Sequence, residues 1–352
     1  RQPKFRNLCL KRGTVGQIMT NMNIGIVSYG LHFPKDFETA EDVAAKARLP
    51  LPEVTALGII RKCLPSQNDQ PVSMAVKAAE DAFQRAGGVQ PTDVDVVIWT
   101  GEEYKDYIAQ TASIRLQEET GCVNAWAFDL VGQGVTSIQG LRVARDLMTG
   151  DKDVNTVLLA GGTRNVDLVD YGNPDTHFLL AAAASGGAML LRRGLGRNRL
   201  MATAFTVDED MADEVFVPGG GTEIPFSHGN LDSDVMFYQT RRPAVVRDYL
   251  AKRWTRALSE VVQQVLCGLS PDYVALRHLT PAERIAVLDH LATDPGQSAA
   301  LDTWGCHGTN DAILSLDLGL KSGAIRDGSH VVLVSGGIGF TYAAALIRWG
   351  AA

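Results

Sequence analysis

The chain has 352 residues, 45% hydrophobic and 21% charged, which is typical of a globular protein large enough for two similar halves. Its net charge of −7 argues against nucleic-acid binding, which usually needs a clustered basic surface. No apolar run is long enough to span a membrane, and the five scattered cysteines lack metal-ligand spacing, so we expect reduced thiols in a cytoplasmic protein without a bound metal.

The first 21 residues are basic, contain no acids and lack the apolar core of a secretory signal. We expect residues 1–21 to be a flexible extension or residues added for expression, with a targeting peptide as the alternative. The first convincing strand begins close to residue 22, so we expect the folded part to start there.

The next 140 or so residues alternate short β-rich runs with apolar stripes of helical spacing. The clearest helix, at 71–86, repeats apolar residues every three or four positions and stops at Gly87. The pattern predicts strands at 23–29, 93–100, 125–130 and 154–160, and helices at 39–47, 71–86, 109–119 and 135–150.

The segment 125–150, AWAFDLVGQGVTSIQGLRVARDLMTG, predicts a strand, a sharp turn and a helix. Many enzymes hold a nucleophile at such an elbow, because the free N–H groups and the dipole of the helix favour negative charge. The apex of this turn offers Gln133 and Gly134, and neither is a nucleophile.

Residues 179–207 predict two strands around a turn, whereas 208–240 show no periodicity and form either a functional loop or part of a binding site. A long helix follows at 241–267. Strands are then expected at 272–276, 331–334 and 340–348, and helices at 281–292 and 309–322.

The second part of the chain repeats the first. Segments 146–162 and 319–337 both run from a helix end through Thr/Ser-Gly, a charged turn and an apolar strand to a glycine pair. We therefore expect an α/β protein with two pseudo-symmetric halves, 22–200 and 201–352.

Three sequence patches carry a resemblance to a known family: FDLVGQG with LRVA after it, FVPGGGTEIP, and GGIGFTYAAALIR near the end. Over about residues 22–350 the chain resembles β-ketoacyl-ACP synthase III of the thiolase superfamily. The resemblance implies a five-layer αβαβα fold, usually a homodimer, with the active site between the halves at the end of a pantetheine tunnel. Coenzyme A or phosphopantetheine would be part of the substrate, and no separate cofactor is implied.

The family's chemistry uses a Cys at the elbow, a His after the first strand of the second half and an Asn before a later helix. Without gaps, the Cys position holds Gly134, and a shift of one residue would place Gln133 there. The His position falls on Arg277, with His278 adjacent, and the Asn position holds Cys306.

The remaining resemblance favours a branch of synthase III-like acyltransferases from antibiotic pathways. These are similar in a WG…HG…D pattern, found here at 304–311, in which Asp311 is the counterpart of an Asp that pairs with the His. Ile338 stands in a glycine turn that resembles the one in this family. The resemblance implies that the backbone N–H groups of Ile338 and Gly134 would bind an oxyanion. By this resemblance, substrate or coenzyme A would be contacted by Arg277, His307, Arg61 and Arg284.

Each of these residues also has a purely structural interpretation. His278 could bond locally in its loop, Asp311 could stabilise the first turn of a helix, and Gln133 could be a turn residue facing solvent. Cys306 could be a nucleophile or could only line the pocket.

The leading expectation is acyl transfer from acyl-CoA or an acyl carrier protein without a Cys acyl-enzyme, in polyketide-type secondary metabolism. His278, oriented by Asp311, would act as general base. One alternative is a malonyl-thioester decarboxylase using Gln133 and His278. The other is a catalytically silent subunit that forms a heteromer with an active ketosynthase homologue.

Overall fold

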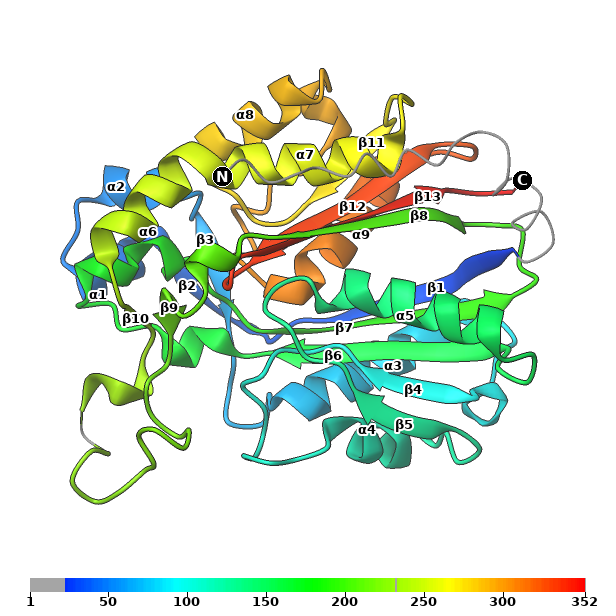
Figure 1. The fold of residues 1–352 in the computed structure, drawn as a ribbon, viewed down its shortest axis with the longest axis horizontal. Helices are drawn as coiled ribbons and strands as arrows, with labels where there is room; N and C mark the ends of the chain where they lie inside the picture. The colour runs from blue at the N-terminus through cyan, green and yellow to red at the C-terminus, as the bar shows by residue number, and fades with distance from the viewer. Residues whose placement is uncertain (1–22, 232, 352) are drawn as a thin grey trace.

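The computed structural model describes residues 23–231 and 233–351, so the expected extension at 1–21 lies outside the described residues. Nine strands form one sheet in the order β11-β12-β13-β8-β1-β7-β6-β4-β5. Strands β1 and β8 are joined through a single pair, Gly25 with Arg199, so the sheet divides into a five-stranded and a four-stranded part (Figure 1).

The two parts have matching cores of parallel strands: β4 runs parallel to β5 and β6, and β11 parallel to β12. The first part consists of β5 (Trp126–Asp129), β4 (Val96–Trp99), β6 (Thr156–Thr163), β7 (Ser185–Arg193) and β1 (Ile24–His32). The second consists of β8 (Arg199–Val207), β13 (Thr341–Arg348), β12 (His330–Gly337) and β11 (Tyr273–Leu276).

Helices cover both sheets on both faces. Helices α3 (Pro71–Ala86) and α4 (Ala112–Thr120) pack outside the first sheet, and α7 (Thr255–Leu266) and α8 (Pro281–His290) outside the second. Helices α5 (Thr136–Gly150) and α9 (Asp311–Lys321) lie between the two sheets, as Figure 1 shows. The expected five-layer αβαβα arrangement, a thiolase-like fold, is thereby confirmed.

The shorter elements are those that the sequence predicted least well. The expected helix at 241–267 is interrupted: α6 (Pro243–Tyr249) and α7 are separated by a π-helical turn at Leu250–Trp254. The pattern missed α2 (Leu51–Ala56) and the β2 (Asp36–Thr39) and β3 (Arg61–Leu64) pair that surround α1 (Ala40–Ala47). The division of the halves near residue 200 stays a prediction.

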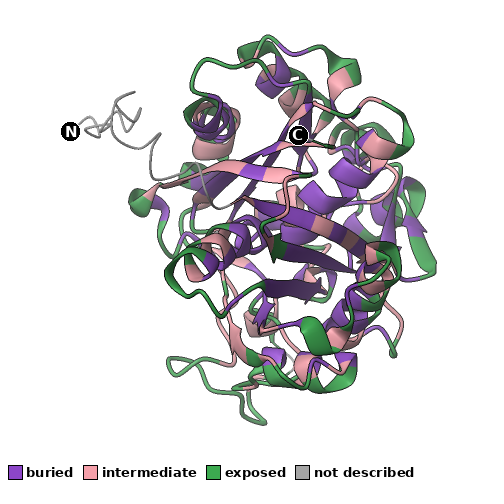
Figure 2. Ribbon diagram, turned by 90° about the vertical axis from the view of Figure 1, so that its right-hand side faces the viewer, coloured by how far each residue is buried: buried purple, intermediate pink, exposed green. Residues whose placement is uncertain are grey.

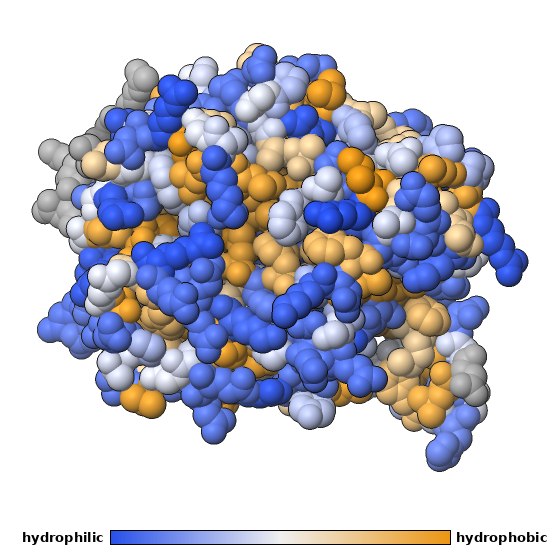
Figure 3. Space-filling model, turned by 180° about the vertical axis from the view of Figure 1, so that it is seen from behind, coloured by the Kyte–Doolittle hydropathy of each residue, from blue (hydrophilic) through white to orange (hydrophobic). Residues whose placement is uncertain are grey.

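The unpatterned segment 208–240 is a projecting loop. Strands β9 (Val215–Phe216) and β10 (Gln239–Thr240) pair at its base, and the residues between them extend away from the body of the protein. Figure 3 shows apolar side chains on this projection, and Phe226 packs against Gly219 and Gly220 there.

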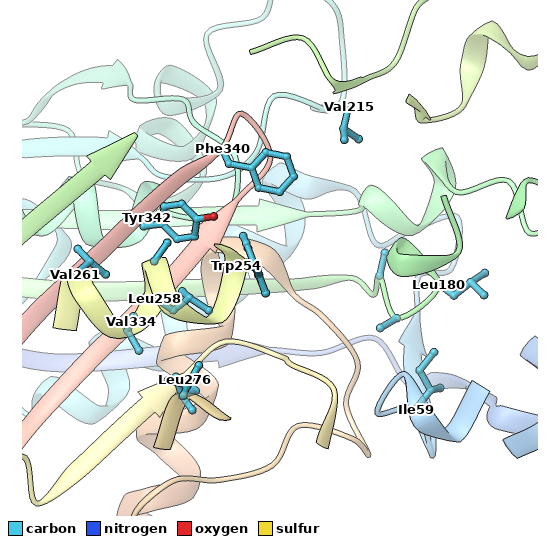
Figure 4. Packing of buried hydrophobic residues seen from close by; sticks show 14 of the residues in the cluster. Ile59, Leu180, Val215, Trp254, Leu258, Val261, Leu276, Val334, Phe340 and Tyr342 are labelled. Atoms are coloured by element: carbon cyan, nitrogen blue, oxygen red, sulfur yellow. The ribbon is translucent and has the colours of Figure 1, made fainter. Parts of the chain in front are cut away.

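Buried residues fill the strands and the inward faces of the helices, whereas loops and outward helix faces are exposed (Figure 2). Around the π-helical turn the core is aromatic: the Trp254 ring lies 5.3 Å from the Tyr342 ring and 5.8 Å from the Phe340 ring, between centroids. Figure 4 shows Trp254 and Phe340 in the same cluster, and both residues line the cavity described below. No helix in the described ranges has the length and apolarity needed to cross a membrane.

Strand β7 approaches the backbone of α3 too closely for any side chain. A Cβ on Gly186 would lie 1.9 Å from the carbonyl oxygen of Met74. We expect Gly186→Ala to lower the free energy of unfolding by about 1–3 kcal/mol, because the helix or the strand must move. Thermal or urea unfolding measures this. Gly150→Ala, where a Cβ meets no atom within 4 Å, is the matched control, and equal stability of both variants would contradict the prediction.

Candidate active site

A cavity of about 130 Å³ lies between the halves, at the carboxyl ends of β11 and β12. Its walls are mostly apolar, and Leu57, Phe178, Leu179, Leu250 and Trp254 contribute to them. The polar side chains that reach it all come from the second half: Arg277, His278, Thr280, Glu283 and Cys306. An apolar cavity with a few convergent polar groups is the usual form of a ligand site.

The elbow has no room for a nucleophilic side chain. Gly134 has a φ of +71°, and a Cβ there would lie 2.7 Å from the carbonyl oxygen of Gly336. Such a φ favours glycine, and the carbonyl belongs to backbone that cannot simply rotate away. The last residues of β12 therefore occupy the space into which a side chain at position 134 would project.

The predicted oxyanion donor at Gly134 is already bonded. Its N–H donates to the carboxylate of Glu102, at 3.0 Å and 3.2 Å to the two oxygens. This corrects the expectation that the Gly134 N–H is open to a substrate. The other expected donor, Ile338, does line the cavity, in the turn between β12 and β13.

Glu102 is a site residue that the sequence interpretation missed. It follows β4, is 1% exposed, and also accepts the N–H of Thr309 at 3.1 Å, so it joins the two halves. Burial raises its pKa to about 7, although the N–H groups of Gly134 and Thr309 act in the opposite direction. An acidic residue just past the carboxyl end of a parallel strand, beside the elbow, was the available signal.

Gln133 is not among the residues that line the cavity. Its main-chain carbonyl packs against Gly337, where a Cβ would lie only 1.7 Å away. The structure therefore does not bring the Gln133 amide to His278, as the decarboxylase alternative requires.

Arg277 takes the position expected for the catalytic His. Its Nη2 donates to the Cys306 sulfur at 3.0 Å, its Nη1 donates to the Gly336 carbonyl, and its guanidinium lies 5.1 Å from the centre of the Trp254 ring. Burial lowers the pKa of Arg277, but Cys306 and Asp311 more than offset this, so the group stays cationic.

His278 lines the cavity, but its ring is not paired with Asp311. Ring atom Nε2 lies 2.9 Å from the Gly58 carbonyl, so Nε2 carries the proton and Nδ1 is left as the acceptor. Asp311 instead accepts the backbone N–H groups of His278 at 3.1 Å and His307 at 2.7 Å. The expected His–Asp pairing is thus corrected: Asp311 fixes the backbone on both sides of the cavity. Burial lowers the pKa of His278 and keeps the ring neutral.

Cys306 lines the cavity as a thiol. Burial and Asp311 raise its pKa to about 11, despite the nearby guanidinium of Arg277. Its sulfur also lies 3.5 Å from a carboxylate oxygen of Asp311. A thiol with this pKa is a poor nucleophile near neutral pH, so of the two earlier interpretations the geometry favours lining the pocket.

The other three expected contact residues lie outside the cavity lining. His307 is fully buried with its ring edge against Phe33, and burial lowers its pKa to about 4. Arg61 covers the Phe37 ring at 4.3 Å, and Arg284 donates to the carbonyls of Pro295 and Ser298. A role for Arg61 or Arg284 at the mouth of the tunnel stays a prediction.

Within 23–231 and 233–351, no group of three His, Cys, Asp or Glu residues is placed to hold a metal.

Two family models match the chain. Residues 128–209 match 3-oxoacyl-[acyl-carrier-protein] synthase III, and residues 272–349 match its C-terminal part. The β-ketoacyl-[acyl-carrier-protein] synthase III of Caldanaerobacter subterraneus subsp. tengcongensis is 23% identical over 92% of this chain and 97% of its own length. The protein of the same name from Synechocystis sp. is 26% identical over 83% of this chain and 87% of its own.

Solved structures give the same result for the fold. The 3-oxoacyl-(acyl carrier protein) synthase III of Pseudomonas aeruginosa matches with a TM-score of 0.80 and 20% identity, covering 93% of this chain and 98% of its own. The priming β-ketosynthase of a polyketide biosynthetic pathway matches with a TM-score of 0.78 and 18% identity, covering 94% and 97%. The elbow lies in the segment 128–209 that matches the first family model, and the C-terminal turn lies in the segment 272–349 that matches the second.

Glu102 makes the stability of the protein depend on pH. Its pKa of about 7 in the folded state lies above the ordinary 4.5, so its contribution to stability is full below the ordinary value and is lost as the pH rises to about 7. Because Gln cannot ionise, we expect Glu102→Gln to gain about 2 kcal/mol relative to the wild type between about pH 5 and about pH 8. Urea unfolding at both pH values tests this. Glu103→Gln, its exposed neighbour, is the control, and a difference independent of pH would contradict the prediction.

Proposed function

Because this chain is a β-ketoacyl-ACP synthase III-like protein with the thiolase-like fold, related to enzymes that act on acyl thioesters, we propose that it is an acyltransferase that works without an acyl-enzyme. The acyl group passes directly from an acyl-CoA or acyl-ACP thioester to an acceptor. The acceptor attacks the thioester carbonyl, its bond to the acyl carbon forms as the C–S bond breaks, and its proton passes through a base to the departing thiolate.

The observation that carries this proposal is the elbow. Position 134 holds a glycine whose surroundings exclude a side chain, so no residue stands where an acyl-enzyme would form. The nearest thiol in the cavity, Cys306, has a pKa raised to about 11. Direct transfer still benefits from positioning and from an oxyanion site, so the loss of the nucleophile does not remove all catalysis.

His278 is the proposed general base, and the Ile338 N–H is the proposed oxyanion donor. Both residues line the same cavity, which supports their acting on one substrate. The neutral His278 ring has Nδ1 available to accept a proton while Nε2 is anchored on Gly58. Asp311 acts as a positioning residue, through the backbone of His278.

One observation favours a rival function, a silent subunit that pairs with an active homologue. Glu102 occupies the Gly134 N–H, and Arg277 occupies the Gly336 carbonyl, so the elbow is held by internal bonds. The decarboxylase alternative has no such support, because Gln133 does not line the cavity.

The biological setting is part of the proposal, and the similarity to known proteins supports it. The similarity to a priming β-ketosynthase of a polyketide pathway supports a role in secondary metabolism, with a carrier protein or coenzyme A as donor and no separate cofactor. The charge and the cysteine content support a cytoplasmic protein that binds neither nucleic acid nor membranes.

A homodimer is proposed through the edge of the first sheet at β5, which pairs with no further strand among residues 23–231 and 233–351. Strand β5 is the last strand on that side, and Trp126 on it is 50% exposed, while Ile114 and Val123 nearby in the chain are 58% and 71% exposed. An unpaired edge with large apolar side chains is a template for pairing with another chain.

We expect Trp126→Lys combined with Ile114→Lys to convert the dimer to a monomer, because two charges would be buried at the interface. Light scattering after size exclusion measures the mass. Ile285→Lys, at an exposed apolar position on α8, is the control and should leave the dimer intact. A wild-type monomer, or a double variant that stays dimeric, would argue against this edge.

With water as the acyl acceptor, we expect His278→Ala to reduce thiol release from acetyl-CoA and malonyl-CoA by at least about 100-fold, because the variant lacks the base that deprotonates the acceptor. His290→Ala, an exposed histidine on α8, should retain the wild-type rate. Intact-mass spectrometry should find no acyl adduct on the wild type. A stable adduct would exclude direct transfer, whereas a wild type that releases no thiol and co-purifies with a homologue would favour the silent subunit.

A further inference from the structure

We propose that Lys62 is a positioning residue for the cavity, where its buried ammonium, paired with Glu38, holds one wall in place. That wall is the segment 178–182. Four of its residues line the cavity: Phe178, Leu179, Ala181 and Ala182. The inference goes beyond acyl transfer, because it concerns how the cavity keeps its shape, whatever ligand enters it.

The Lys62 ammonium has three partners for its three protons. Its Nζ donates to the Leu180 carbonyl oxygen at 2.6 Å and lies 3.3 Å from a carboxylate oxygen of Glu38. The same nitrogen lies 4.8 Å from the centre of the Tyr171 ring. Lys62 is 0% exposed and Glu38 is 2% exposed. Removing either member of such a buried pair leaves the other charge without compensation, so each depends on the other.

The bond from Lys62 fastens the wall at its middle residue, Leu180. The wall is also bonded to the loop that carries Cys306. The Cys306 N–H donates to the Ala181 carbonyl at 2.7 Å, and the Ala183 N–H donates to the Cys306 carbonyl at 2.9 Å. Loss of the Lys62 contact removes one of these two attachments. We therefore expect the wall to move away from the cavity and to expose the Cys306 thiol, which lines it.

Glu38 is the partner that keeps Lys62 charged. The two residues lie opposite each other on the paired strands β2 and β3. Tyr171 donates its hydroxyl to Glu38 at 2.5 Å, and Lys46 of α1 lies 2.5 Å from the same carboxylate. Burial by itself would raise the pKa of Glu38, but Lys46, Tyr171 and Lys62 together hold it below its ordinary value. The carboxylate is therefore ionised at neutral pH and favours the charged form of Lys62.

The contact is sensitive to mild alkali. Burial lowers the pKa of Lys62 to about 8, although the Glu38 carboxylate acts in the opposite direction. The other charged groups that face it are Lys46, which also lowers this pKa, and Cys306, which raises it. Burial and Glu38 raise the pKa of Tyr171, so its hydroxyl stays neutral. Above about pH 8, Lys62 loses the charge that attracts Glu38, and we expect the wall to loosen.

The first test measures how fast iodoacetamide alkylates Cys306 at pH 7, relative to the exposed Cys267 of the same molecule, by peptide mass spectrometry. We expect Lys62→Met and Glu38→Gln each to raise this ratio at least about tenfold, because local opening admits the reagent. For Lys62→Met the electrostatic effect has the opposite sign, since losing a nearby cation disfavours the Cys306 thiolate.

Two exposed positions provide matched controls. Lys152→Met, in the turn between α5 and β6, and Glu41→Gln, on α1, should leave the alkylation ratio unchanged. Thermal unfolding shows which variants are folded, and Glu38→Gln, which keeps the size of the side chain, decides the test if Lys62→Met does not fold. A ratio that stays at the wild-type value in folded Glu38→Gln would overturn the inference.

The second test follows the affinity for acetyl-CoA against pH, by calorimetry. We expect the wild type to bind at least about threefold more weakly at pH 9 than at pH 7, because fewer molecules hold the closed wall. Lys62→Met should bind weakly at both pH values, since it has no proton to lose. Glu38→Gln should move the transition to lower pH, because the carboxylate that raises the pKa of Lys62 is absent. A purely structural role for the pair would not move this midpoint.

The two tests separate this inference from the proposed function. A wild type that binds acetyl-CoA equally well at pH 7 and pH 9, or a transition that Glu38→Gln leaves in place, would overturn the role of Lys62 and leave acyl transfer standing. A wild type that binds no acetyl-CoA would count against transfer from coenzyme A, and the alkylation ratio would still decide whether Lys62 holds the wall.

Discussion

The structure depends on a backbone contact between the halves, where the elbow of the first meets the glycine turn of the second. Gly134 faces the Gly336 carbonyl, Gln133 presses on Gly337, and the Ser335 hydroxyl donates to the Gly134 carbonyl at 2.5 Å. Only residues without side chains allow this approach. A second contact between the halves holds the central layer. The N–H and the hydroxyl of Ser137, in α5, donate to the hydroxyl and the carbonyl of Thr309, just before α9. The elbow beside the cavity is therefore held by close main-chain packing together with hydrogen bonds that involve the buried side chains of Ser335, Ser137 and Thr309.

Near this contact lie three ionisable side chains, Glu102, Asp311 and Arg277, and none of them forms an ion pair with another described residue. The Glu102 carboxylate accepts two backbone N–H groups and Asp311 accepts two others, whereas Arg277 donates to two carbonyls and a sulfur. Each ion is held by dipoles on the backbone, which is an acceptable substitute for a counter-ion only when the bonds are well aligned. The same arrangement explains why the pKa of Glu102 is raised and that of His278 is lowered: burial outweighs the dipoles in both cases.

The sequence predicted the layers well because the long elements are strongly periodic. Helix α3 begins and ends where its apolar stripe and Gly87 placed it. The π-helical turn at Leu250–Trp254 was missed, since one extra residue in a turn leaves an apolar stripe almost unchanged.

The site was predicted less well than the fold. The sequence correctly predicted that one cavity would contain His278, Arg277, Cys306 and Ile338. The hydrogen-bond partners of Asp311 and Glu102 could not be predicted, because residue spacing does not determine side-chain orientation.

The closure of the elbow also bears on how such a protein changes over generations. A lost nucleophile could in principle return by one substitution at position 134. In this structure the Gly336 carbonyl lies 2.7 Å from the point where a Cβ at position 134 would sit, so a side chain there would meet backbone before it met a substrate. A side chain at position 134 would therefore also require the backbone at Gly336 to shift, about 200 residues away in the chain. The packing of the two glycine segments thus couples any substitution at position 134 to the backbone of the other half.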